Sequence, residues 1–121
     1  MSEFDGINDR LFNWDPRLKR LRQYVDQNYS EHIPLEKAAR VAALESSYFS
    51  SYFRDMVGIS FSDWLRLFRI KKAMELMKAS DFSITELAEE VGFGDLRTFE
   101  RAFKKHTMTT PREFKKFVRP G

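Results

Sequence analysis

Apolar residues recur along this chain at spacings of three and four, the period of an α-helix. One such face carries Leu18, Leu21 and Val25, and it follows Asp15-Pro16, a pair typical of a helix start. Gly and Pro are few and stand at the breaks between periodic runs. Because no stretch sustains strand alternation or an Asn-Gly hairpin signal, we predict an all-α fold.

Capping and stop residues mark six further helices after that first one. Ser60 and Asp63 predict a capped helix start, and Gly58 predicts the end of the preceding helix. Two capping boxes, at 83–86 and 110–113, open later helices. The seven predicted ranges are 15–28, 35–42, 47–57, 61–79, 84–91, 96–106 and 111–118. The helix over 61–79 would be about 28 Å long.

A unit of short helix, tight turn and longer helix occurs twice. The matching pairs are Leu35 with Ile84, Ala39 with Ala88, Leu44 with Phe93, Phe49 with Phe99, Phe53 with Phe103, Ser60 with Thr110 and Trp64 with Phe114. This unit is typical of a helix-turn-helix, in which small Ala39 and Ala88 allow two helices to cross closely. Gly92 permits the sharp second turn, whereas Ala43 makes the first turn less relaxed. The long helix could hold two such units near the separation of about 34 Å between successive major-groove segments.

Basic residues concentrate in the last third of the chain, although the formal net charge is only +3. From position 97 onward the cations are Arg97, Arg101, Lys104, Lys105, Arg112, Lys115, Lys116 and Arg119. Only Glu100 and Glu113 oppose them there. This distribution favours a polyanion partner, with a simply solvated charged face as the alternative.

Composition excludes several other classes. The absence of cysteine removes disulfides and thiolate chemistry, and it fits a reducing compartment. No apolar run approaches the length of about 20 residues that a membrane helix needs, and the acidic N-terminus lacks a signal-peptide pattern. We therefore expect a soluble cytoplasmic protein. His32 and His106, the only histidines, lie in separate predicted segments, and no catalytic, cofactor or metal-ligand motif accompanies them. We predict that the chain is not an enzyme, with His106 at a helix end or at a phosphate edge.

Residues 18–118 resemble the DNA-binding domain of AraC/XylS-type bacterial transcription regulators. The most specific stretch is SDFSITELAEEVGF over 80–93, with the motifs over 98–105 and 110–114 continuing it. RIKKA over 69–73 resembles the linker-helix pattern of that family. Residues 1–14 show no clear period, so we expect an irregular lead-in there. The resemblance implies helix-turn-helix subdomains over 15–59 and 81–121, and a linker helix over 60–80. It also implies recognition of double-stranded promoter DNA by two helices in adjacent major-groove segments.

The resemblance also implies positions that contact DNA. Base-reading positions would be Leu96, Arg97, Glu100 and Arg101 in the second motif, and Ser47, Ser50 and Ser51 in the first. Phosphate contacts would come from Arg54, Thr98, Lys104 and Lys105.

Side-chain chemistry supports part of this assignment. Arg97 and Arg101 share a helix face, and arginine suits the paired acceptors of guanine. Glu100 could accept a hydrogen bond from cytosine or pair with a neighbouring lysine. Leu96 could meet a thymine methyl group or close the turn.

Two departures from the family pattern leave alternatives open. Ser51 stands where many family members carry arginine, so the first motif would act by docking, through water or by reading DNA shape, unless Ser50 and Ser51 are merely solvated. The lead-in is too short for the effector domain of most members. The chain is therefore either a stand-alone regulator or a fragment of a longer one.

The two reading units in one chain predict binding as a monomer. RNA polymerase is a further candidate partner, through exposed acidic groups such as Asp26, Glu31 or Asp55. A helical protein-interaction module is the competing function, and its binding would respond weakly to salt.

Overall fold

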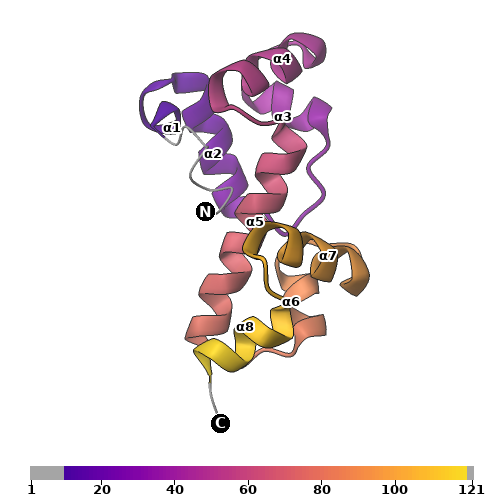
Figure 1. The fold of residues 1–121 in the computed structure, drawn as a ribbon. Coiled ribbons are helices and arrows are strands. Elements are labelled where there is room, and N and C mark those ends of the chain that lie inside the picture. The colour runs from indigo at the N-terminus through magenta and orange to yellow at the C-terminus, as the bar shows by residue number, and fades with distance from the viewer. Residues whose placement is uncertain (1–9, 120–121) are drawn as a thin grey trace. The chain divides into compact units, whose positions relative to one another are not determined.

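The computed structural model describes residues 10–119, and every regular element in that range is a helix (Figure 1). The helices are α1 (Leu11–Trp14), α2 (Pro16–Asn28), α3 (Leu35–Val41), α4 (Ser46–Val57), α5 (Phe61–Ala79), α6 (Ile84–Glu90), α7 (Leu96–Thr107) and α8 (Pro111–Val118). The all-α prediction is confirmed, and the seven predicted helices correspond to α2 through α8. Two compact units divide the chain within α5, one ending at Leu65 and the other starting at Arg66.

The helices of the first unit begin and end at the residues that the sequence marks. Asp15 caps α2 by accepting a 3.0 Å hydrogen bond from the backbone N–H of Arg17. The Ser60 hydroxyl accepts one of 3.2 Å from the backbone N–H of Asp63 at the start of α5. Gly58 ends α4 in the left-handed region with φ of 106°, a conformation that glycine adopts without steric cost.

An aromatic cluster forms much of the first unit's core. The rings of Phe49, Phe53 and Phe61 lie 5.5–5.7 Å apart, centroid to centroid, in tilted or edge contacts. Trp64 adds a further edge contact with Phe53 at 5.8 Å. Such contacts contribute beyond the apolar area that they bury.

One expectation is wrong for the segment before Asp15. Residues 11–14 form the additional helix α1 rather than an irregular lead-in, and Leu11 and Phe12 are buried. Phe12 stacks on Trp64 at 5.1 Å, so tertiary packing holds a helix that is too short to show a period. The rest of the expected lead-in, residues 1–9, lies outside the described residues.

The two tight turns repeat the same hydrogen-bond pattern. The backbone N–H of Leu44 donates to the carbonyl of Ala39 at 2.9 Å, and that of Phe93 donates to the carbonyl of Ala88 at the same distance. Each turn contains a residue of positive φ, Gly92 at 92° and Ala43 at 60°. The predicted contrast is therefore present, because alanine pays a steric cost that glycine avoids.

The second unit is capped as predicted and packs around phenylalanines. Both capping boxes form, with Ser83 and Glu86 opening α6 and Thr110 opening α8. A chain of ring contacts links α7 to its neighbours, through Phe93–Phe99 at 5.3 Å, Phe99–Phe103 at 5.8 Å and Phe103–Phe114 at 5.7 Å. This packing holds one side of α7 and leaves the other side to solvent.

Across residues 10–119, no helix is both long and apolar enough to cross a membrane. The same residues contain no group of three or more His, Asp or Glu side chains placed to hold a metal ion.

Candidate nucleic-acid interface

Helix α7 begins at a doubly bonded cap. One carboxylate oxygen of Asp95 accepts a 2.8 Å hydrogen bond from the backbone N–H of Thr98, and the other accepts a 2.9 Å bond from its hydroxyl. These bonds are the largest influences that lower the pKa of Asp95. Because the Thr98 hydroxyl gives its hydrogen to Asp95, Thr98 acts in the cap here. Its predicted phosphate contact would need that hydroxyl to turn away.

The remaining surface of α7 divides into a buried face and a cationic face. Phe99, Ala102, Phe103 and His106 are buried. The exposed cations are Arg97, Arg101, Lys104 and Lys105. All four were predicted contacts, and the structure brings them together on one helix. Because these cations are exposed and about one helical turn apart, they can contact successive charges of a polyanion without disturbing the packing of α7.

The two other predicted base-reading positions of α7 are half-buried. Within residues 10–119, no ion pair joins Glu100 to a lysine or arginine, so the pairing alternative is not realised in this structure. Leu96 is the first residue of α7 and is partly covered, so both of its possible roles are compatible with its position.

Helix α4 presents a neutral surface at the matching positions. Ser47 and Ser51 are exposed and Ser50 is half-buried, while Arg54 supplies an exposed cation one turn further along. The Ser47 hydroxyl donates a short hydrogen bond to the carboxylate of Glu45. The Ser47 hydroxyl is therefore already engaged within the chain, and the limited base reading expected of α4 stays a prediction.

Sequence reasoning missed an aromatic and ionic network on the first unit. Tyr48 on α4 is 54% exposed, and its ring lies 5.8 Å from that of Tyr52. The guanidinium of Arg17 lies over the Tyr52 ring at 4.8 Å, and the Tyr52 hydroxyl donates a short hydrogen bond to Asp15. The only sequence signal was the cap residue Asp15, which gave no sign of its long-range partner.

This network changes the acid–base chemistry of its members. Burial opposes the charged form of Asp15, but the hydrogen bonds from Tyr52 and the backbone N–H groups of Arg17 and Leu18 hold its pKa below the ordinary value of 3.8. Burial and the bond to Asp15 raise the pKa of Tyr52. The carboxylate is therefore kept ionised and acts as the structural anchor of α2.

Part of the basic C-terminal region serves the fold. Lys115 on α8 makes a 3.1 Å ion pair with Asp81, and the Arg119 side chain donates to the carbonyl of Met77 at 3.5 Å. Among the described residues, none of the four exposed cations of α7 makes an ion pair, although the charge of Arg101 adds to the hydrogen bonds that lower the pKa of Asp95, and that of Lys104 adds to those that lower the pKa of Glu113. The cations of α7 are therefore more available to a partner than Lys115 and Arg119 are, and a count of basic residues alone would not show this difference.

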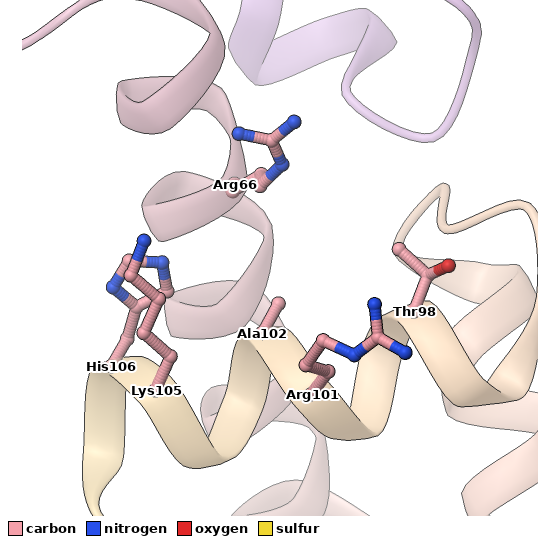
Figure 2. A pocket seen from close by; sticks show the side chains of 6 residues that line it. All are labelled: Arg66, Thr98, Arg101, Ala102, Lys105 and His106. Atoms are coloured by element: carbon pink, nitrogen blue, oxygen red, sulfur yellow. The ribbon is translucent and has the colours of Figure 1, made fainter.

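A hollow of about 260 Å³ lies against the same helix. Figure 2 shows Thr98, Arg101, Ala102, Lys105 and His106 on α7 and Arg66 on α5, with the Arg66 guanidinium directed away from the side chains of α7. His106 is 3% exposed and lies in the last turn of α7, so the helix-end assignment holds and an exposed phosphate-edge position is wrong. His32 lies separately, exposed in the segment between α2 and α3.

Comparison with known proteins identifies the class of this chain. A family described as a helix-turn-helix domain matches residues 38–116. The chain belongs to this family, of the AraC type, whose members are transcription regulators and not enzymes.

Among individual relatives, the arabinose operon regulatory protein of Salmonella typhimurium is 32% identical over 111 residues, which are 90% of this chain and 40% of that protein. The chain spans between 14% and 40% of the length of the curated relatives that it matches.

Solved structures share the fold. The C-terminal domain of AraT, a response regulator from Geobacillus stearothermophilus, matches with a TM-score of 0.77 and 32% identity, over 84% of this chain and 85% of that one. The DNA-binding domain of AdpA, a global transcriptional factor solved in complex with a target DNA, matches with a TM-score of 0.78 and 23% identity, over 87% and 96%. The two-motif AraC-type fold predicted from the sequence is confirmed.

Proposed function

We propose that this chain regulates transcription in a bacterial cytoplasm by binding double-stranded promoter DNA in a sequence-specific manner. Helices α4 and α7 would enter adjacent major-groove segments as the two recognition helices. The comparison with AdpA supports this through the shared fold, since that domain was solved on its target DNA.

One observation carries the proposal. The exposed side of α7 presents four cations, while its opposite side is buried against the second unit. Arginine side chains can donate two parallel hydrogen bonds to guanine, and lysine side chains suit phosphate oxygens. We therefore assign Arg97 and Arg101 to base reading, and Lys104 and Lys105 to the backbone.

Helix α4 would contribute less to sequence readout than α7. Its serines offer small neutral contacts, and Arg54 is placed for a phosphate. We infer that α4 contributes mainly affinity and register, while α7 contributes most of the direct sequence readout.

Further partners follow from the same assignment. Two reading units in one chain allow a single copy to occupy a site, so we propose that the chain binds as a monomer. The acidic residues Asp26, Glu31 and Asp55 are all exposed, which leaves RNA polymerase as a candidate partner.

A pair of variants on α7 tests the assignment. Arg101→Ala should weaken binding to the selected site by about 1–3 kcal/mol and relax the preference at one base pair. Lys104→Ala should weaken selected and random duplexes alike, because a phosphate contact carries no sequence information. Fluorescence anisotropy on both duplexes measures the difference. Equal losses on both duplexes from Arg101→Ala would remove its base-reading role.

A further inference from the structure

Tyr52 on α4 lies at the centre of a network that reaches the start of α2. Its hydroxyl donates a short hydrogen bond to the carboxylate of Asp15. The Arg17 guanidinium lies over its ring at 4.8 Å and donates to the hydroxyl oxygen at 3.4 Å. Tyr48, one turn earlier on α4, places its ring 5.8 Å from that of Tyr52. The network therefore joins two helices through residues that lie 35 and 37 positions apart.

The two carboxylate oxygens of Asp15 have separate roles. Oδ1 caps α2, because it accepts hydrogen bonds from the backbone N–H groups of Arg17 at 3.0 Å and Leu18 at 3.5 Å. Oδ2 accepts the bond from Tyr52. Burial and this bond raise the pKa of Tyr52, so its hydroxyl keeps the hydrogen that it donates. Loss of the Tyr52 hydroxyl would therefore leave the cap of α2 in place.

The bond to Asp15 gives α4 a directional restraint. The buried residues of α4 are Phe49, Phe53 and Val57. Their burial is not directional, whereas a hydrogen bond weakens steeply as its angle departs from the preferred geometry. Tyr52 is half-buried and stands between exposed Ser51 and buried Phe53 in the sequence. Its bond therefore limits the rotation of α4 about its own axis.

The second copy of the repeat cannot form this restraint. The offset of 50 that matches Phe53 with Phe103 also matches Tyr52 with Ala102 on α7. A methyl group cannot donate a hydrogen bond. The exposed arginines of α7 have several side-chain torsions with which to reach a partner, whereas the serines of α4 are short and have few. The placement of the helix axis and face therefore matters more for α4 than for α7.

We propose that Tyr52 is a positioning residue for DNA recognition, and that its bond to Asp15 holds α4 at the rotation that presents Ser47 and Ser51 to the duplex. This inference rests on the proposed function of α4 as a recognition helix. Tyr52 needs no contact with DNA in this role. Arg17 supports the same arrangement, because it holds the ring of Tyr52 from its face.

The orientation of α4 can be measured without DNA, from residual dipolar couplings of the backbone N–H groups. Tyr52→Phe removes the hydroxyl and keeps the ring. In this variant the couplings over 46–57 should shrink or no longer fit the orientation that those over 16–28 define. Tyr24→Phe is the matched control, since Tyr24 is also a half-buried tyrosine beneath a cation, Lys37 at 5.7 Å, but lies outside the network. Its couplings should stay as in the wild type.

Binding to DNA tests the consequence of that orientation. Tyr52→Phe should weaken binding to the selected duplex by about three- to tenfold, because the loss cannot exceed the contribution of one hydrogen bond. Random duplex should lose less, so the ratio of the two affinities falls. A purely structural effect would remove active protein and weaken both duplexes by the same factor. The salt slope should not change, since no phosphate contact is lost. Tyr24→Phe should leave the ratio unchanged.

A second variant breaks the same bond from its other end. Asp15→Ser retains a good helix cap but has one side-chain oxygen in place of two. It should therefore lower the affinity ratio by about the same factor as Tyr52→Phe. The double variant should lower the ratio no further than either single variant, because both remove one interaction.

The proposal is overturned if the couplings of α4 in Tyr52→Phe match those of the wild type. Equal weakening of selected and random duplexes would also overturn it, as would losses that multiply in the double variant. If the wild type binds no duplex, the proposed function fails, and the couplings alone then decide whether Tyr52 orients α4.

Discussion

At the scale of single residues, Asp15 shows how one side chain can join local and long-range structure. It caps α2 and also accepts a hydrogen bond from Tyr52 on α4. These bonds keep its pKa below the ordinary value despite burial. The carboxylate therefore stabilises the folded state in its ionised form.

Asp15→Ala should lower the free energy of unfolding by about 1–3 kcal/mol near neutral pH, through loss of the cap and of the bond to Tyr52. Because the folded pKa lies below 3.8, this contribution is fully present above that pH and is lost as the pH falls through the folded value. Urea denaturation should therefore show a stability difference between wild type and variant that narrows as the pH falls below 3.8. A stability difference that stays constant as the pH falls below that value would contradict the assigned role of the carboxylate. The fully exposed capping acids titrate in both proteins and cancel in the comparison.

The two turn residues of positive φ offer a second test at this scale. Ala43→Gly should raise the free energy of unfolding by about 0.5–1 kcal/mol, because relief of the left-handed strain exceeds the entropy cost of glycine. The reciprocal change, Gly92→Ala, should lower it by about 1 kcal/mol. Thermal melts of both variants measure these shifts. A destabilised Ala43→Gly would mean that the first turn is not strained.

At the scale of elements, the helix boundaries could be predicted because their signals are local. Caps such as Ser83 and Thr110 need only a partner three residues away, and both formed as expected. Helix α1 could not be predicted in this way, since Phe12 is held by Trp64 some fifty positions later. The hollow at Arg66 could not be predicted from the sequence either, because its walls come from two helices, α5 and α7.

The candidate site likewise contains residues that the sequence could predict and residues that it could not. The cations of α7 could be assigned from spacing and from the family resemblance, and the structure exposes all of them. Tyr48 was missed because an aromatic residue at helical spacing usually packs in a core, whereas this ring is 54% exposed. Motif matching also could not show that Thr98 and Ser47 already donate their hydroxyl hydrogens to neighbouring carboxylates.

The contrast between α4 and α7 yields a prediction about recognition. Ser51→Ala should change affinity for the selected duplex by less than about 0.5 kcal/mol, whereas Arg101→Ala at the matching position of the repeat should cost about 1–3 kcal/mol. Anisotropy titrations at one salt concentration compare them directly. A loss from Ser51→Ala as large as that from Arg101→Ala would show that α4 reads bases as strongly as α7.

At the scale of the whole molecule, the chain is a duplicated unit whose copies have diverged in chemistry. The first copy carries serines on its recognition helix and an internal Asp15–Tyr52 network, while the second carries cations and an open hollow. Under the proposed function, the two copies would supply two reading elements in a single chain, which is why we expect one copy per site. A complex that forms only with two chains on a single site, as measured by mass of the protein–DNA complex, would contradict that expectation.

Selection from a random duplex DNA library, followed by binding of the enriched sequence at two salt concentrations, tests the central claim most directly. The account predicts an enriched motif that spans two neighbouring major-groove segments, with the stronger base preference in one of them and with affinity that falls steeply as salt rises. Enrichment of a single short segment would show that the first unit reads nothing. Absence of any enrichment or binding at low salt would contradict DNA recognition by this chain and favour a protein-interaction module instead.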